Sequence, residues 1–288
     1  MTITKPTDHI EFTLNYSPQA ADLLRAGQIA FDRFKCPDWP ELIEPARALR
    51  PVYVHFPLRA SNHLIAGVDL ERVAAMRADT ETPHVNIHLA PYMRDFAAEF
   101  GSFDPYNLTE AQRETIITRM TADVQRLAQR FGPEHVLVEN VPYRNDPTHH
   151  PKLTIEPQVI RRVLAETGCR FLLDTAHAAI TAWSLGIPVT EYIAELPLDR
   201  LGELHVTGVQ WHEGRLMDHL ALTDDDWPIV AWTLDQIRGG RAARPWAISC
   251  EYGGVTEVFN WRSDAGVIAE QIPRLAALIK PLQMQPTE

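Results

Sequence analysis

Cysteine is scarce in this sequence, which holds only Cys36, Cys169 and Cys250 in 288 residues. Domains stabilised by disulfides carry more cysteines at closer spacing. These three stand far apart and are odd in number, so we expect reduced thiols and a cytoplasmic protein.

Long apolar runs are also missing. No stretch of the chain approaches the ~18 consecutive apolar residues of a membrane-spanning helix. The first residues, MTITKPTDHIEF, lack the apolar core of a secretory signal peptide. We therefore expect neither membrane insertion nor secretion by that route.

Positive charge is in short supply. Lysine and arginine number 27 against 38 acidic residues, which gives a net charge of -11, and the basic residues form no cluster. Such a chain repels phosphate backbones, so we do not expect a nucleic-acid partner. A glycine-rich phosphate loop is absent after the first expected strand, where the sequence reads LNYSPQAADLL, and this disfavours a doubly wound nucleotide-binding sheet.

What the chain does have is a regular alternation of short β-rich runs and helical stretches. Several runs are almost continuously apolar, which is typical of parallel strands covered by helices. The alternation predicts an α/β fold, a single (β/α)8 TIM barrel over residues 1–288. The expected strands are 9–16, 31–37, 52–58, 84–90, 135–141, 171–177, 201–208 and 245–252, and the clearest helices are 17–27, 109–132, 156–168 and 264–282.

Ionisable side chains gather at the ends of these expected strands. In a barrel the carboxyl ends of the strands form the catalytic face. A lone histidine or glutamate there is most often a hydrogen-bonded or capping residue, but so many together are costly in an apolar barrel unless they are paired or bind metal. Imidazole with carboxylate favours Zn, Fe, Mn or Co over Ca. The residues are His55, His88, Glu139, Asp174, His177, His205, His219 and Glu251.

This series of strand ends resembles the xylose isomerase-like barrel superfamily, across about residues 50 to 255. VLVENVPY, then IEPQVIRRVLAETGCRFLLDTAHAAITAWSLG, then YIAELPLDRLGELHVTG resemble the multinuclear non-haem iron-dependent oxidases within it. The metal-ligand pattern is similar to that of the endonuclease IV type as well.

The resemblance implies two metal positions and a third. One ion would be held by His55, His88 and Glu139. A second would be held by Glu139 as a bridge, together with the ligands Asp174, His205 and Glu251.

The third ion would depend on His177 and His219. Relatives usually have an aspartate two residues before the loop histidine, but here Met217 stands there and Asp218 is displaced by one. Neighbouring residues of an extended chain point to opposite sides, so only a local turn would bring Asp218 and His219 together. We therefore expect two firmly held metals and a third held weakly or not at all.

Three function classes compete. The resemblance favours an iron-dependent oxidase of a peptide or small molecule, with two to three divalent ions and Glu139, Glu251, His177 and His219 as catalytic residues. The alternative is a sugar isomerase or epimerase with one metal, and a metal-dependent phosphodiesterase comes third. Thr207-Gly208 follows the strand-seven histidine, where sugar epimerases commonly have Lys-Asp and endonucleases Asn-Asp.

Overall fold

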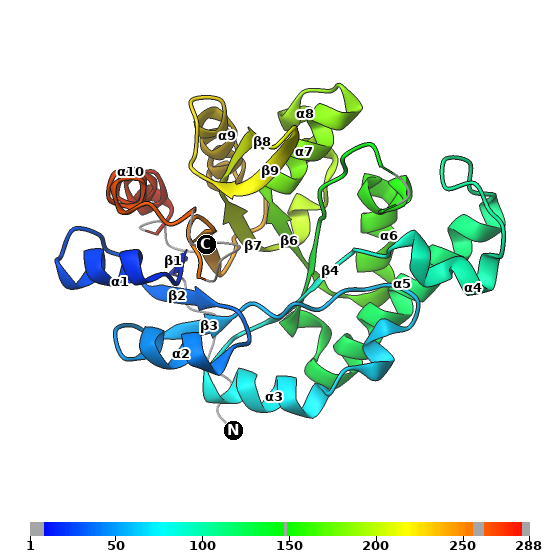
Figure 1. Ribbon diagram of the computed structural model, residues 1–288, viewed down its shortest axis with the longest axis horizontal. Coiled ribbons are helices and arrows are strands. Elements are labelled where there is room, and N and C mark those ends of the chain that lie inside the picture. The colour runs from blue at the N-terminus through cyan, green and yellow to red at the C-terminus, as the bar shows by residue number, and fades with distance from the viewer. Residues whose placement is uncertain (1–8, 147–148, 256–261, 284–288) are drawn as a thin grey trace. The chain divides into compact units, whose positions relative to one another are not determined.

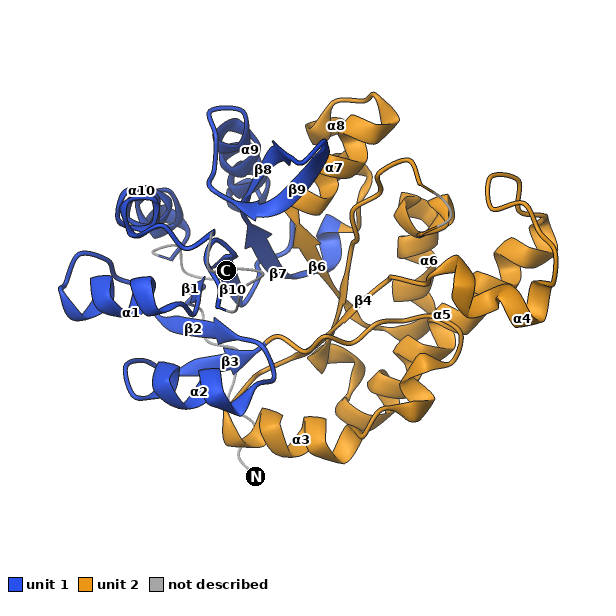
Figure 2. Ribbon diagram, viewed as in Figure 1, with its two compact units in different colours: residues 1–54, 198–288 blue, residues 55–197 orange. Residues whose placement is uncertain are grey.

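The computed structural model describes residues 9–146, 149–255 and 262–283, and within these the chain forms two compact units (Figure 2). Unit 1 comprises residues 1–54 and 198–288, and unit 2 comprises residues 55–197. The single domain over 1–288 therefore stays a prediction, and each unit is described by itself.

Unit 1 is built on parallel strands in the order β3-β2-β1-β10-β7. Helix α10 packs against both α1 and α9, and α2 contacts β2 and β3 (Figure 1). An antiparallel hairpin, β8–β9, follows β7. The elements are β1 (Glu11–Asn15), α1 (Pro18–Arg25), β2 (Arg33–Cys36), α2 (Pro40–Arg47), β3 (Val52–Val54), η5 (Leu198–Arg200), β7 (Leu201–Val206), β8 (Gly208–His212), β9 (Arg215–Leu220), α9 (Asp226–Arg238), β10 (Ala247–Cys250) and α10 (Ala265–Gln283).

Unit 2 is built on the parallel strands β6-β5-β4. The long helix α5 contacts β4 and β5 and packs on α6, while α7 packs on α8 (Figure 1). The elements are η1 (Leu64–Gly67), α3 (Leu70–Asp79), β4 (Val85–His88), η2 (Met93–Phe96), α4 (Ala97–Phe100), α5 (Glu110–Phe131), η3 (Pro133–His135), β5 (Val136–Glu139), η4 (Lys152–Ile155), α6 (Pro157–Thr167), β6 (Arg170–Asp174), α7 (Thr175–Leu185) and α8 (Val189–Glu195).

The helix ends follow from local chemistry. Ser17 caps α1 by accepting a hydrogen bond from the Ala20 amide at 3.1 Å, and Thr109 and Gln112 form a capping box on α5. The four predicted helices are found within a residue or two of their expected ends.

All eight expected strands are present, but two expectations need correction. The run 171–177 is not all strand, because β6 ends at Asp174 and α7 begins at Thr175. The segment after β7, which was expected to be a loop, forms the β8–β9 hairpin. Its turn uses positive φ at Glu213 (48°) and Gly214 (78°), the backbone that a tight hairpin requires.

Candidate metal centre

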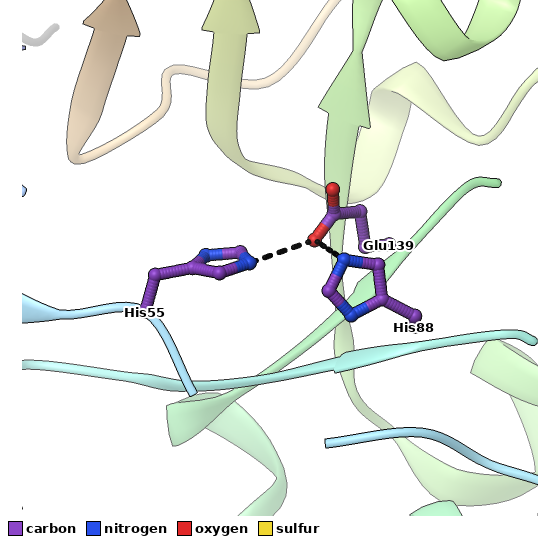
Figure 3. A group of neighbouring side chains, drawn as sticks. All are labelled: His55, His88 and Glu139. Atoms are coloured by element: carbon purple, nitrogen blue, oxygen red, sulfur yellow. Dashed lines mark ion pairs between the residues drawn. The ribbon is translucent and has the colours of Figure 1, made fainter. Parts of the chain in front are cut away.

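Glu139 is the residue around which the donors of unit 2 gather. It ends β5 and is 1% exposed. His55, directly after β3, and His88, the last residue of β4, both direct Nε2 at the same carboxylate oxygen (Figure 3). The distances from Glu139 Oε2 are 3.5 Å to His55 and 3.1 Å to His88. These three side chains offer ligand atoms that all lie within 4.8 Å of one another.

Asp174 and His177 form a second group with the same Glu139. One ligand atom from each of the three residues lies within 4.8 Å of the others. Asp174 is the N-cap of α7, and its Oδ1 accepts the His177 amide at 2.8 Å. The cap holds the aspartate at the start of the helix, and the third helical residue then carries the imidazole back toward it. His177 Nε2 lies 3.7 Å from Asp174 Oδ2.

Backbone carbonyls fix which ring nitrogen each of these histidines presents. His88 Nδ1 donates to the Leu58 carbonyl at 3.1 Å, and His177 Nδ1 donates to the Asn140 carbonyl at 2.8 Å. Each ring therefore keeps its proton on Nδ1 and presents the lone pair of Nε2 toward a carboxylate. This is the arrangement typical of metal-binding histidines.

Asn140 joins the end of β5 to the end of β6. It is fully buried, its Oδ1 accepts the Asp174 amide at 2.8 Å, and its Nδ2 donates to the Asp174 carbonyl at 3.0 Å. The Asn140 side chain thereby sets the position of Asp174 relative to Glu139, which directly precedes Asn140 in the sequence.

We expect Asn140→Ala to lower the free energy of unfolding by roughly 2–4 kcal/mol, because it leaves a buried amide and a buried carbonyl of Asp174 without these bonds. Urea unfolding measures the loss. The exposed Asn107 is the matched control, and Asn107→Ala should change stability by no more than ~0.5 kcal/mol. Equal losses for the two variants would contradict the role given to Asn140.

The donors of unit 1 are His205 on β7 and Glu251 directly after β10. His205 is fully buried, and its Nδ1 lies 3.2 Å from Glu251 Oε1. Its other nitrogen, Nε2, lies 2.8 Å from Glu203 Oε1. Glu203 thus accepts a hydrogen bond from Nε2 of His205, whereas in unit 2 backbone carbonyls accept from Nδ1 of His88 and His177. His205 therefore presents Nδ1, and not Nε2, to a metal ion.

Glu203 was not among the residues predicted from the sequence. Its oxygens also accept from Tyr53 Oη at 2.9 Å and from Trp246 Nε1 at 3.0 Å. Burial alone would raise the pKa of this carboxyl, but the His205 hydrogen bond and the charges of His205 and Lys35 hold the pKa below its usual value. The alternation of β7 was the available indication, because Glu203 and His205 are two residues apart and share a face.

Lys35 on β2 is the second residue that was missed. Its side chain is 5% exposed, and its ammonium contacts Glu251 Oε1 and lies 3.3 Å from His205 Nε2. A lysine in a strand is rarely buried unless it is paired. The sequence FDRFKCP therefore held an indication, but not the identity of the partners.

The hairpin places His219 beside Glu251. His219 Nδ1 donates to the Glu251 carbonyl at 3.2 Å, and Nε2 lies 3.9 Å from Glu251 Oε2. The backbone at His219 is left-handed, with φ of 58°, which is the local turn that an extended strand lacks. Ligand atoms of Asp218 and His219 lie within 4.8 Å of each other, and the weakly held third metal stays a prediction.

Cys250 takes no part in these groups. It is buried beside Glu251, and burial raises the pKa of its thiol to about 11, so it acts as a small apolar residue, as expected. Among the described residues, no helix has both the length and the apolar character needed to cross a membrane.

The donor chemistry fits divalent transition metals. Unit 2 offers three imidazoles, of which His88 and His177 have a fixed tautomer, and carboxylates that are almost fully buried, a set that suits Fe, Zn, Mn or Co. Glu139 belongs to both of the groups in unit 2, as a bridging carboxylate would. The buried His/carboxylate groups thus indicate a multinuclear site, and the structure does not name the metal.

Solved structures similar to this chain share its fold. A xylose isomerase domain protein of Salmonella typhimurium LT2 gives a TM-score of 0.54 at 15% identity, covering 97% of this chain and 99% of its own. A D-allulose 3-epimerase of Methylomonas sp. gives 0.56 at 14% identity, covering 93% of this chain and 96% of its own. These likenesses confirm the predicted fold class, an α/β, xylose isomerase-like TIM barrel.

Relatives similar in sequence include a UPF0276 protein of Acaryochloris marina, 28% identical over 187 residues, or 64% of this chain. The chain spans 59% of that relative's length. A UPF0276 protein of Caulobacter vibrioides is 30% identical over 119 residues, covering 40% of this chain and 39% of that protein.

The sequence model of one enzyme family, described as RiPP precursor modification enzyme MbnB/TglH/ChrH, matches residues 54–239. The match takes in His55, His88, Glu139, Asp174, His177, His205 and His219. It confirms the oxidase-family resemblance drawn from the strand ends. The chain belongs to the MbnB/TglH/ChrH family of enzymes that modify ribosomally synthesised peptide precursors.

Proposed function

We propose that this protein is an iron-dependent oxidase that modifies a ribosomally made peptide with the use of O2. The observation that carries the proposal is Glu139, which is shared by two donor groups inside the region that matches the family. A shared carboxylate supports more than one ion, whereas a sugar isomerase or epimerase of the alternative kind needs one metal.

The residues divide the work of such a site. In our proposal His55, His88 and Glu139 hold one ion, and Asp174 and His177 join Glu139 around another. The assignment of Asp174, His205 and Glu251 to a shared ion, and of His177 and His219 to a third, stays a prediction. When bound, the ions supply the redox chemistry that moves electrons from the peptide to O2.

The protein's own contribution is orientation and exclusion of water. Carbonyl hydrogen bonds hold His88 and His177 in one tautomer, and Glu203 does the same for His205. Near-complete burial of Glu139 and Asp174 strengthens their electrostatic effect on charge that develops nearby. As catalytic residues we propose Glu139, Glu251, His177 and His219, because imidazole and carboxylate are the groups that most often transfer protons in enzymes.

The substrate and setting follow from the same reasoning. The family name indicates a peptide precursor, and the net charge of -11 disfavours nucleic acid. We place the enzyme in the reducing cytoplasm, where its three buried cysteines stay thiols.

The test begins with protein purified anaerobically without added metal. Elemental analysis should find about two or more irons per chain, with Zn, Mn or Co in smaller amounts. Short ribosomal peptides encoded beside the gene should then change mass only when O2 is present, as measured by mass spectrometry. A single Mn, Co or Mg per chain, with ketose interconversion that is independent of O2, would instead establish the epimerase alternative.

A further inference from the structure

Lys35 lies where its ammonium neutralises the donors of unit 1. It comes from β2, whereas His205 comes from β7, and β1 and β10 separate these strands in the sheet. Flat strands at that separation would be roughly 14 Å apart. The sheet of unit 1 is therefore curled, and the lysine side chain reaches across its concave face to His205 and Glu251.

Lys35 places its positive charge against the two side chains that would bind a metal ion in unit 1, His205 and Glu251. Its Nζ contacts Glu251 Oε1 and lies 3.3 Å and 3.5 Å from the two ring nitrogens of His205. The same Glu251 oxygen lies 3.2 Å from His205 Nδ1. Since Glu203 engages His205 Nε2, the Nδ1 lone pair and the Glu251 oxygen are the donors left for an ion, and the ammonium contacts that oxygen and lies 3.5 Å from that nitrogen.

We propose that Lys35 is a built-in cation that competes with a metal ion for His205 and Glu251. The proposal rests on the metal-binding part of the proposed function, and it adds the order in which the metal sites bind their ions. The groups around Glu139 in unit 2 load first, and His205 and Glu251 accept an ion only when Lys35 moves aside.

Two features of unit 1 support the competition. Lys35 and Glu251 are both almost fully buried, at 5% and 4% side-chain exposure, so water screens little of the repulsion between an ammonium and a divalent ion. Glu203 engages His205 Nε2, so His205 directs its Nδ1 lone pair toward Glu251 Oε1, the oxygen that the ammonium contacts.

Lys35→Met tests the proposal, because methionine keeps an unbranched side chain only one atom shorter than that of lysine and removes its charge. Metal-stripped protein is titrated with Co²⁺ under anaerobic conditions, and bound metal is read by visible absorption and by elemental analysis. We expect Lys35→Met to bind about one ion more per chain than the wild type at low free Co²⁺, with an affinity for that ion raised on the order of tenfold or more.

Matched variants locate the additional ion. Lys35→Arg keeps the charge and should bind as the wild type does. Adding His205→Ala to Lys35→Met should remove the gain, whereas adding His88→Ala should leave the gain and remove metal from unit 2. The proposal is overturned if Lys35→Met binds no more Co²⁺ than the wild type, or if Lys35→Arg gains as much.

A measurement on a chain that keeps Lys35 covers the case in which Lys35→Met does not fold. At low free Co²⁺, His205→Ala alone should bind as much metal as the wild type, while His88→Ala should bind less. Equal losses in the two variants would overturn the proposal. Failure of the oxidase proposal would give a different result. Co²⁺ would still bind first to the groups around Glu139 and later to His205 and Glu251, but no peptide would be oxidised.

Discussion

Replacing Glu139 by glutamine should remove more metal than any other single change in unit 2. The amide keeps the shape of the side chain, but it loses the negative charge and turns one oxygen acceptor into a donor. Because Glu139 belongs to both donor groups of unit 2, the change weakens both at once. We expect metal affinity to fall on the order of 100-fold or more.

The comparison with His177→Ala makes this prediction specific. His177 belongs to only one of the two groups that lie wholly within unit 2, so its loss should leave the ion between His55, His88 and Glu139 in place. Elemental analysis of the two variants, purified side by side without added metal, should show clearly less metal in Glu139→Gln. Equal losses, or none, would contradict the bridging role of Glu139.

Glu134 provides the control for the chemistry of the substitution. It lies in η3, just before the opposite end of β5, and is exposed to solvent. Glu134→Gln removes the same charge from the same segment without touching a donor group. It should retain the metal content of the wild type, and a loss there would point to net charge rather than coordination.

The parts of the site that the sequence predicted are those that chain connectivity determines. Glu139 and Asp174 follow directly from apolar strands, and the carboxyl ends of parallel strands meet at one edge, so a linear reading brings His88, Glu139 and Asp174 together. The helix 109–132 was predicted for a similar reason, because helical periodicity and caps such as Thr109 with Gln112 depend on residues a few positions apart.

The parts that were missed depend on contacts across the sheet. Lys35 and Glu251 are 216 residues apart, and nothing local to FDRFKCP indicates that its lysine pairs with a carboxylate beyond β10. Glu203 is different, because alternation along β7 would have placed it on the face of His205. The hairpin was missed because Glu213 and Gly214 were read as part of a loop rather than as a tight turn.

The position of the Asp218 carboxylate depends on the local backbone conformation. An extended chain would separate its carboxylate from His219, which was the reason to expect a weak third metal. The left-handed backbone at His219 brings ligand atoms of the two residues within 4.8 Å of each other. A single φ of unexpected sign thus brings these two donors together, while the weakly held third metal stays a prediction.

Stripping the metal should cost the protein much of its thermal stability. An ion that binds only the folded chain stabilises it by about 4 kcal/mol when its free concentration is 1,000 times the dissociation constant. For a chain of this size, each kcal/mol corresponds to roughly 2–4 °C in melting temperature. We therefore expect chelation to lower the melting temperature by about 8–16 °C.

The burial of the donor carboxylates explains why the metal-free protein should be much less stable to heat. Glu139 is 1% exposed and Asp174 is fully buried, and two carboxylate charges held so far from water are costly unless a cation or hydrogen-bond donors offset them. Differential scanning calorimetry before and after chelation measures the shift, and added Fe²⁺ under anaerobic conditions should reverse it. Glu139→Gln sets the baseline, because its melting temperature should hardly respond to the chelator. A wild-type melting temperature that stays unchanged on chelation, in protein shown by elemental analysis to have lost its metal, would mean that the buried carboxylates are stabilised by the chain alone.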